Sequence, residues 1–181
     1  MRKINEIFCS LQGEGFHTGT PAVFVRFSGC NLKCSFCDTQ HEEGVWMSDE
    51  EILAEVGKYP AVTVILTGGE PSLWIDREFV DCLHWMGKYV CIETNGTHSL
   101  PDNIDWVTCS PKQGAKLCIS RMDEVKVVYE GQDIAVYESL PAGHFFLQPC
   151  SCSNTAETVA CVMQHPKWRL SLQTHKLIEI K

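Results

Sequence analysis

The chain has 181 residues, of which 44% are apolar, and its formal net charge is −8. This length suits one domain with a substantial core, and so acidic a chain is not expected to bind a nucleic-acid backbone, which requires concentrated Lys and Arg. No apolar run approaches the ~18 residues of a membrane helix, and residues 1–6 lack the apolar segment of a signal peptide, so we expect a cytoplasmic protein.

Short apolar runs rich in β-branched residues recur along the chain and predict strands. The run Val62–Leu66 is almost continuously apolar, as expected of a parallel strand that is covered on both faces. An extended segment, Ile4–Leu11, precedes the others. The further strands are predicted at Pro21–Ser28, Ala61–Leu66, Lys88–Glu93, Ile104–Cys109, Glu124–Tyr129, His144–Leu147 and Trp168–Leu172.

Helical patterns lie between some of these strands. Ser48 and Glu51 have the spacing of a capping box and begin a helix that carries Ile52 and Val56. A second helix is predicted over Asp76–Met86, with Phe79, Val80 and Leu83 on one face and Gly87 as its end. Further helices are predicted over Asp133–Leu140 and over Thr155–Gln164, which Pro166 follows.

The connections Gly96–Ile104 and Gly114–Met122 are too short for full helices. A closed eight-fold barrel typically needs ~250 residues. We therefore expect an α/β fold in the form of a partial, reduced (β/α) barrel, with a mostly parallel curved sheet and few short helices, as one domain over residues 1–181.

Small and polar residues follow nearly every predicted strand at its carboxyl end. Ligands of parallel α/β proteins bind at that edge of the sheet, so these segments predict a wide mouth that holds more than one ligand. They are Ser28-Gly29-Cys30, Thr67-Gly68-Gly69-Glu70-Pro71, Glu93-Thr94-Asn95-Gly96, Ser110-Pro111-Lys112, Gln148-Pro149 and Gln173-Thr174-His175.

The chain contains 11 cysteines, an odd number in a chain too long to depend on disulfides. We expect most of them to be small buried apolar residues, for example Cys91 and Cys109 in strand-like runs. Cys150 and Cys152 flank a single serine, a spacing that indicates exposed or pocket-edge thiols.

Cys30, Cys34 and Cys37 form a C-x-x-x-C-x-x-C motif directly after a predicted strand. A structural zinc site has four protein ligands, and a four-iron cluster with three thiolates keeps one iron open. Three closely spaced cysteines therefore favour an iron–sulfur cluster with an exchangeable site. The alternatives are a zinc site completed by a distant residue such as His41, or a disulfide pair.

The cysteine motif, followed at a second strand end by Gly68-Gly69-Glu70-Pro71, resembles the radical S-adenosylmethionine superfamily. Taken alone, the second segment could be an ordinary turn. The resemblance implies that the open iron binds the amino and carboxylate groups of S-adenosylmethionine, and that reduction releases a 5′-deoxyadenosyl radical.

Two further segments, Leu11-Gln12-Gly13-Glu14-Gly15 and Cys37-Asp38-Thr39, resemble the 7-carboxy-7-deazaguanine synthase family, and the resemblance extends over essentially the whole chain. It implies a carbon–nitrogen lyase that converts 6-carboxy-5,6,7,8-tetrahydropterin to 7-carboxy-7-deazaguanine with loss of ammonia, toward queuosine and related deazapurines. It also implies Mg²⁺, a flavodoxin- or ferredoxin-type electron donor and a homodimer. Some members have a longer cluster loop than this chain, so donor docking can differ.

The resemblance also implies roles for individual residues, none of them as a side-chain acid or base. Cys30, Cys34 and Cys37 would hold the cluster, and Thr39 would bind Mg²⁺. The substrate would contact Leu11, Gln12, Gly13, Glu14, Arg26, Thr67, His175 and Lys181. S-adenosylmethionine would contact Phe36, Cys37, Asp38, Gly69, Glu70, Glu93, Ser110, Pro111, Lys112, Gln148, Pro149, Cys150 and Ser151.

Several of these residues have simpler interpretations. Arg26 could be a surface or interface residue, Thr39 could cap a turn, and His175 could be a hydrogen-bonded residue of the rim. Glu93 could bind ribose or merely orient the following turn.

Two other functions are compatible with the cysteine motif. A glycyl-radical activating enzyme shares the size and the cysteine spacing but has no use for a pterin pocket. A non-catalytic metal-binding module would be a colourless zinc protein that forms no 5′-deoxyadenosine.

Overall fold

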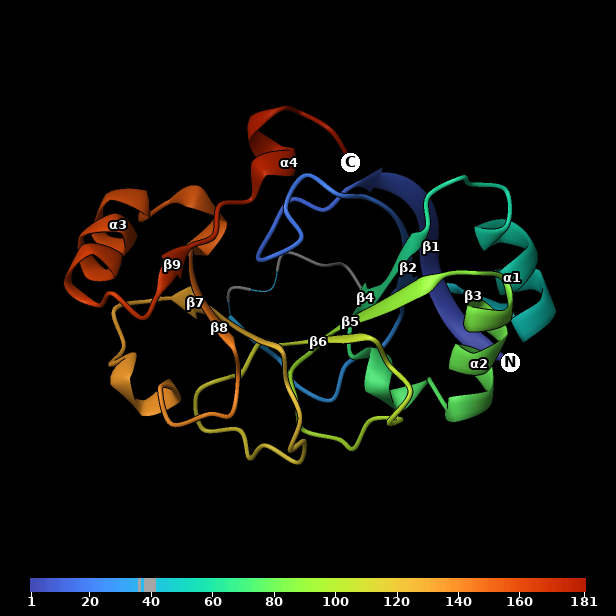
Figure 1. Ribbon diagram of the computed structural model, residues 1–181, viewed down its shortest axis with the longest axis horizontal. Helices are drawn as coiled ribbons and strands as arrows, with labels where there is room; N and C mark the ends of the chain where they lie inside the picture. The colour runs from blue at the N-terminus through green and yellow to red at the C-terminus, as the bar shows by residue number, and fades with distance from the viewer. Residues whose placement is uncertain (36, 38–41) are drawn as a thin grey trace.

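The computed structural model describes residues 1–35, 37 and 42–181. Over these residues, nine strands form one sheet in the order β3-β1-β2-β4-β5-β6-β7-β8-β9. Figure 1 shows the strands as an open arc, with α1 and α2 outside one end and α3 outside the other. The prediction of a mostly parallel, partial barrel is confirmed.

All neighbouring strands from β2 to β9 are parallel, and β1 pairs antiparallel with both β2 and β3. Each strand predicted from the sequence is present, with ends that differ by a few residues. The strands are β1 (Arg2–Leu11), β2 (Pro21–Phe27), β3 (Val45–Met47), β4 (Thr63–Gly68), β5 (Tyr89–Thr94), β6 (Trp106–Cys109), β7 (Glu124–Tyr129), β8 (His144–Pro149) and β9 (Arg169–Leu170).

The described helices are short. The capping box at the start of α1 is confirmed, because Ser48 Oγ accepts from Glu51 N at 3.2 Å and Glu51 Oε2 accepts from Ser48 N at 2.7 Å. The α-helices are α1 (Asp49–Val56), α2 (Arg77–Trp85), α3 (Thr155–Gln164) and α4 (Thr174–Leu177), and the 3-10 turns are η1 (Pro71–Leu73), η2 (Ala135–Tyr137) and η3 (Cys150–Cys152).

The helix predicted over Asp133–Leu140 is wrong, because only the single turn η2 forms there. Ile134, Tyr137 and Leu140 pack against the core at a spacing of three residues, which is the period of a 3-10 turn, while Val136 is largely exposed. Pro141 also disfavours a helical conformation at the residue before it. No periodic pattern predicts β3 and α4, which have three and four residues.

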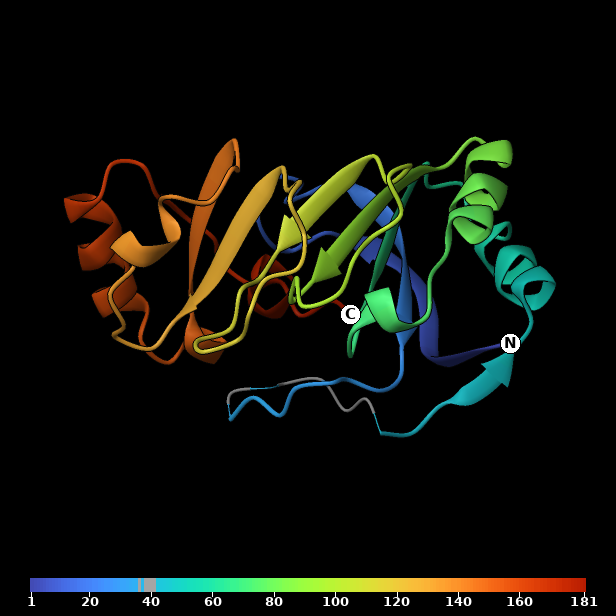
Figure 2. The same ribbon diagram turned by 90° about the horizontal axis from the view of Figure 1, so that it is seen from below.

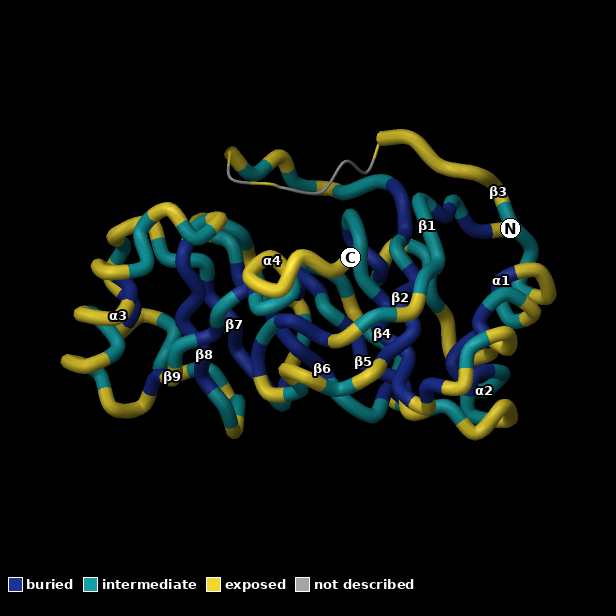
Figure 3. The backbone as a smooth tube through the Cα atoms, turned by 90° about the horizontal axis from the view of Figure 1, so that it is seen from above, coloured by how far each residue is buried: buried dark blue, intermediate teal, exposed yellow. Residues whose placement is uncertain are grey.

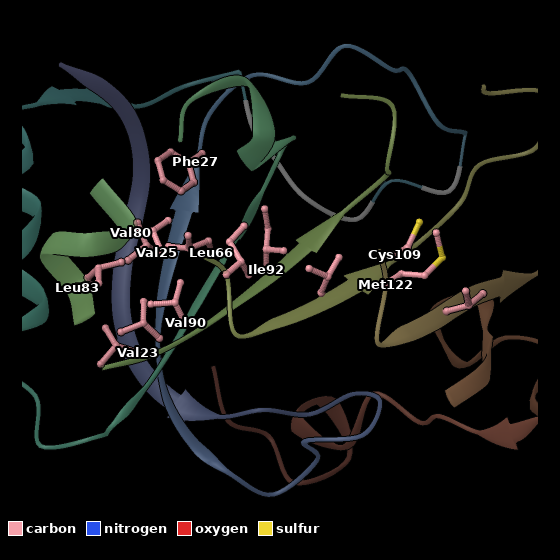
Figure 4. Packing of buried hydrophobic residues seen from close by; sticks show 14 of the residues in the cluster. Val23, Val25, Phe27, Leu66, Val80, Leu83, Val90, Ile92, Cys109 and Met122 are labelled. Carbon is pink, nitrogen blue, oxygen red and sulfur yellow. The ribbon is translucent and has the colours of Figure 1, made fainter. Parts of the chain in front are cut away.

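Alternate residues of the strands face opposite sides of the arc. The outward side chains form the main core beneath the helices, where Val23, Val25 and Ile92 lie on the side of Val80 and Leu83 of α2 (Figure 4). The buried residues concentrate in the central strands, as Figure 3 shows.

The inward side chains change character along each strand. Phe24, Ile65 and Cys91 form a small apolar cluster on the inner face, and two residues further along each strand lie Arg26, Thr67 and Glu93, which line a cavity. Apolar residues therefore close the amino-terminal end of the arc, and polar residues meet at its carboxyl end. Figure 2 shows the chain that leaves β2, drawn in blue, passing across the molecule on that side.

Cys91 and Cys109 are buried within β5 and β6, as predicted. The prediction that most of the cysteines are buried is wrong, because Cys9, Cys37 and Cys118 are exposed and the other six are only partly buried. Burial raises the pKa of both thiols, that of Cys109 to about 12. None of the described helices has the length and apolar character needed to cross a membrane.

Arg2 joins the start of β1 to the first turns of two helices. Its guanidinium donates to Asp49 at 2.8 and 2.9 Å and to Asp76 at 3.0 and 3.2 Å, and it lies 4.4 Å from the centre of the Phe79 ring. Asp76 also caps α2 by accepting from Phe79 N at 2.9 Å.

We predict that Arg2→Met lowers the free energy of unfolding by about 2 kcal/mol, because Asp49 and Asp76 lose the buried guanidinium that joins both helix starts to β1. The midpoint of thermal unfolding, followed by circular dichroism, should fall by roughly 4–8 °C. Arg77→Met removes an exposed arginine of α2 and is the matched control, with an expected change below about 0.5 kcal/mol. Equal effects of the two substitutions would contradict this role of Arg2.

Candidate functional site

The carboxyl ends of the strands enclose a cavity of about 610 Å³. Most of the residues assigned to ligands from the sequence border it, although they come from segments far apart in the chain. They are Leu11, Gln12, Gly13, Glu14, Arg26, Cys30, Cys34, Cys37, Thr67, Gly69, Glu93, Ser110, Lys112, Gln148, Pro149, Cys150, Ser151, His175 and Lys181.

Five further residues are assigned to ligands, and three of them cannot be placed relative to this cavity. Phe36, Asp38 and Thr39 lie outside the described residues, as does His41, the alternative zinc ligand. Glu70 lies behind the wall of the cavity, and Pro111 borders a neighbouring cavity of about 430 Å³ that it shares with Cys34 and Lys112.

The three cysteines of the motif border one side of the larger cavity. Cys30 Sγ accepts from Leu32 N at 3.4 Å, and Cys37 N donates to Cys34 O at 3.2 Å. Burial raises the pKa of the Cys30 thiol. Within the described ranges, no three His, Cys, Asp or Glu side chains lie close enough to bind one metal ion. Cys30, Cys34 and Cys37 therefore share one cavity, and three thiolates are the number that leaves one iron of a four-iron cluster open.

The loop that follows β2 carries Cys30, Cys34 and Cys37 and is called the cluster loop below. The Gly68–Pro71 segment holds it by backbone contacts. Gly69 N donates to Phe27 O and Glu70 N donates to Gly29 O, both at 2.9 Å. A Cβ atom on Gly69 would lie 1.9 Å from Gly29 O, so only glycine fits at this position.

The carboxylate of Glu70 is fully buried and joins η1 to the end of β5. It accepts from Ser72 N at 3.0 Å, Thr94 Oγ1 at 2.6 Å and Asn95 N at 2.7 Å. Asn95 Nδ2 in turn donates to Asn31 Oδ1 of the cluster loop at 3.0 Å. Glu70 thereby orients the end of β5 and the cluster loop.

A lysine that the sequence analysis did not single out lies in the wall of the cavity. Lys126 of β7 is 4% exposed, and its Nζ lies 2.5 Å from Glu14 Oε2 and 3.0 Å from Glu93 Oε2. Gln12 Nε2 donates to Glu93 Oε1 at 2.7 Å, and Gln173 Nε2 donates to Glu14 Oε1 at 2.8 Å. Each of the four carboxylate oxygens therefore has a donor.

Electrostatic interactions keep Lys126 and Glu14 charged. Burial alone would lower the pKa of Lys126, but the attraction of Glu14, Glu93 and Glu124 outweighs it and raises that pKa. Burial alone would raise the pKa of Glu14, but Lys126 and Gln173 hold it below its ordinary value. Glu124 differs, because burial raises its pKa to about 7 although its carboxylate accepts from Phe16 N at 3.0 Å.

Arg26 and Lys181 bring positive charge to the opposite rim. Arg26 Nε lies 2.9 Å from Glu6 Oε1, and Lys181 Nζ lies 2.5 Å from Glu6 Oε2. Lys181 O also accepts from Ser10 Oγ at 2.5 Å. Glu6, like Lys126, had no role in the sequence analysis.

The C-terminal segment crosses the open side of the arc, where Figure 1 shows α4 next to the loop that follows β1. Thr174 donates to Gly13 O through its N at 2.9 Å and through its Oγ1 at 3.0 Å. His175 packs so closely that a Cβ atom on Gly13 would lie 2.0 Å from its Nδ1.

The remaining wall lies beside the cluster loop. Lys112 Nζ donates to Ser110 Oγ at 2.6 Å, and burial lowers the pKa of Lys112. Gln148 Oε1 accepts from Ser171 Oγ at 3.1 Å. Cys150 is half-buried at the cavity edge, and the next two residues, Ser151 and Cys152, adopt left-handed φ angles of 45° and 62°.

The sequence contained a signal for Lys126. It is a charged residue inside the apolar run Glu124–Tyr129, on the same face as Glu124 and Val128. An ionisable residue within a buried strand usually has a charged partner. Its partners, however, lie 112 and 33 residues away in the chain.

Known proteins resemble this chain at three levels. Residues 24–108 match the family model of the Radical SAM superfamily. A 7-carboxy-7-deazaguanine synthase from Bacteroides thetaiotaomicron is 81% identical, with all of both chains covered, and one from Nitratidesulfovibrio vulgaris is 41% identical, with 98% of both covered. The crystal structure of QueE from Escherichia coli matches with a TM-score of 0.79 at 30% identity, covering 94% of this chain and 93% of that one.

We predict that Gly69→Ala displaces the cluster loop, because its methyl group would overlap the Gly29 carbonyl. Such overpacking costs about 1–3 kcal/mol. Iron and acid-labile sulfide per chain after anaerobic reconstitution should fall well below the native values. Gly143→Ala is the control, since its Cβ would lie 3.7 Å from Asp123 O, an ordinary contact. Full cluster loading of Gly69→Ala would contradict the prediction.

Proposed function

The chain belongs to the 7-carboxy-7-deazaguanine synthase family of radical S-adenosylmethionine enzymes, and from this we propose that it converts 6-carboxy-5,6,7,8-tetrahydropterin to 7-carboxy-7-deazaguanine with release of ammonia. The enzyme is a carbon–nitrogen lyase of queuosine and deazapurine biosynthesis. The observation that carries this proposal is the 81% identity, over the full length of both chains, to a relative of that name.

The residues of the cavity fit the groups that this reaction needs. Cys30, Cys34 and Cys37 would hold a [4Fe-4S] cluster, and the cavity between them and Lys126 has room for S-adenosylmethionine and a pterin. When bound, the cluster and S-adenosylmethionine supply the 5′-deoxyadenosyl radical that removes hydrogen from C6 of the substrate.

The protein's own contribution is to bind and orient the two ligands. The carboxylate of Glu14 can accept hydrogen bonds from the pterin ring, whose pyrimidine part presents N–H donors. Arg26 can exchange Glu6 for the substrate carboxylate, because a guanidinium fork suits either acceptor. The segment from Thr174 to Lys181 lies at the mouth against Gly13, Ser10 and Glu6 and would exclude water from the bound ligands.

The covered mouth favours a small substrate over a protein. A glycyl-radical activating enzyme has to admit a peptide segment, whereas here His175 packs on Gly13 and Lys181 is joined to Glu6 across the opening.

The test is anaerobic incubation of the reconstituted protein with carboxytetrahydropterin, S-adenosylmethionine and a reductant. We expect 7-carboxy-7-deazaguanine and 5′-deoxyadenosine, with a broad absorption that extends into the visible. Cys34→Ala should lose the iron and both products. Cys118→Ala, which removes an exposed cysteine outside the cavity, should retain them.

Two outcomes would contradict the proposed function. A colourless protein that binds zinc and forms no 5′-deoxyadenosine would be a metal-binding module. A protein that forms 5′-deoxyadenosine but no deazaguanine acid, and that installs a radical in a glycine-containing polypeptide, would be an activating enzyme.

A magnesium ion at Thr39 is part of the proposal, supported by the resemblance of Cys37-Asp38-Thr39 to the family and by the preference of Mg²⁺ for oxygen ligands. Thr39→Ala should raise the Mg²⁺ concentration for half-maximal activity by about tenfold, the effect of ~1.4 kcal/mol of lost binding. Cluster content should stay native. An unchanged response to Mg²⁺ would remove this role from Thr39.

The remaining parts of the proposal concern the whole protein. The single sheet from Arg2 to Leu170 supports one radical S-adenosylmethionine domain over residues 1–181. Family membership supports a homodimer, a flavodoxin or ferredoxin as electron donor, and a cytoplasmic location. Sedimentation and reconstitution with each donor protein would test the first two of these.

A further inference from the structure

The ammonium of Lys126 lies between two carboxylates that belong to different parts of the cavity. One ammonium between Glu14 and Glu93 leaves this group with a net charge of −1. The arrangement is buried, and each carboxylate has further donors in Gln12 and Gln173. The group is thus a hydrogen-bonded unit and not a set of independent side chains.

Glu14 belongs to the side of the cavity that the C-terminal segment covers. It lies in the loop after β1, one residue from Gly13, which holds Thr174. Its Oε1 accepts from Gln173, and Gln173 Oε1 accepts from Lys176 Nζ at 2.9 Å. A shift of Glu14 would therefore displace Gln173 and, with it, the C-terminal segment at the mouth.

Glu93 belongs to the side of the cluster loop. It lies near the end of β5, next to Thr94 and Asn95, whose contacts with Glu70 and Asn31 fix that loop. Lys126 thus connects the wall that would contact the pterin with the wall that would contact S-adenosylmethionine.

Stability alone does not account for such a lysine. A buried ion pair generally stabilises a fold no better than well-packed apolar residues of similar volume. Val125 and Val127, which flank Lys126 on β7, are apolar residues of this kind and pack in the core on the outer face. The Lys126 side chain instead lines the cavity with both carboxylates.

We propose that Lys126 is a positioning residue that couples the binding of the pterin substrate to the binding of S-adenosylmethionine by holding Glu14 and Glu93 in one arrangement. This inference rests on the proposed function. A ligand that orders either carboxylate orders the shared ammonium and hence the other carboxylate. Each ligand should then bind more tightly in the presence of the other, by the same factor.

The experiment measures the dissociation constant of S-adenosylmethionine for the reconstituted holoenzyme, anaerobically and without reductant, with and without saturating carboxytetrahydropterin. For the native protein we expect binding that is about tenfold tighter with the pterin, within the usual range of coupling. Lys126→Met should reduce this ratio to near one. Lys126→Arg should regain part of it, because a guanidinium can donate to both carboxylates.

Lys88→Met is the matched control. Lys88 is a half-buried lysine of the same chain whose Nζ donates to Tyr59 O at 3.2 Å and Ala61 O at 2.7 Å, away from the cavity. It should keep the native ratio. If Lys126→Met does not fold, Lys126→Gln takes its place, since its amide can donate to one carboxylate but carries no charge.

The outcomes are distinct. A native ratio in Lys126→Met, or equal weakening of both affinities with the ratio kept, would overturn the proposal. Failure of both the Met and Gln variants to fold would overturn it too, by assigning Lys126 to the fold. If the native holoenzyme does not bind carboxytetrahydropterin, the proposed function itself fails; native coupling that survives Lys126→Met rejects only the role of Lys126.

Discussion

The inner face of the arc imposes one constraint on the whole site: its polar groups are shielded from water and must satisfy one another. A buried carboxylate or ammonium without a partner is costly. Lys126, Glu14 and Glu93 meet this requirement together with Gln12 and Gln173, and Glu70 meets it with three donors behind the cavity. The wall of the site is consequently a connected set of charges and dipoles, in which the position of each carboxylate depends on the ammonium that it shares.

The cluster loop depends on a contact between backbones. Gly69 lies directly against the Gly29 carbonyl, so the end of β4 and the loop after β2 approach more closely than side chains would allow. Glu70 also accepts hydrogen bonds from Thr94 and Asn95 at the end of β5, and Asn95 donates a hydrogen bond to Asn31 of the loop. A short segment thus serves two purposes: its glycines permit the approach and its glutamate fixes the neighbours. These contacts explain why the loop lies at the cavity although several of its own residues, such as Asn31 and Lys33, are exposed.

The sequence predicts the parts of this molecule that depend on local patterns. The strands, the capping box at Ser48 and the helix at Thr155–Gln164 follow from periodicity, since each buries one face. The polar ends of the strands follow from parallel order, because they have to meet at one edge. Lys126 and Glu6 could not be assigned in this way, since their meaning depends on partners elsewhere in the chain. The family resemblance predicts that Glu70 contacts S-adenosylmethionine, but no local pattern predicts that its carboxylate accepts from Ser72, Thr94 and Asn95 behind the wall.

The open arc and the position of the cavity both follow from the short connections between the strands. The connections after β5 and β6 are loops without helices, and β1 runs antiparallel to β2, so the sheet does not close on itself. The loop after β1 and the segment around α4 occupy the side that a closed barrel would fill with strands (Figure 1). These two segments contact each other at Gly13 and Thr174 and carry Gln12, Glu14 and His175 to the cavity. The residues that cover the gap in the barrel are therefore the same ones that can hold a small substrate, and the reduced fold places them there without an additional lid.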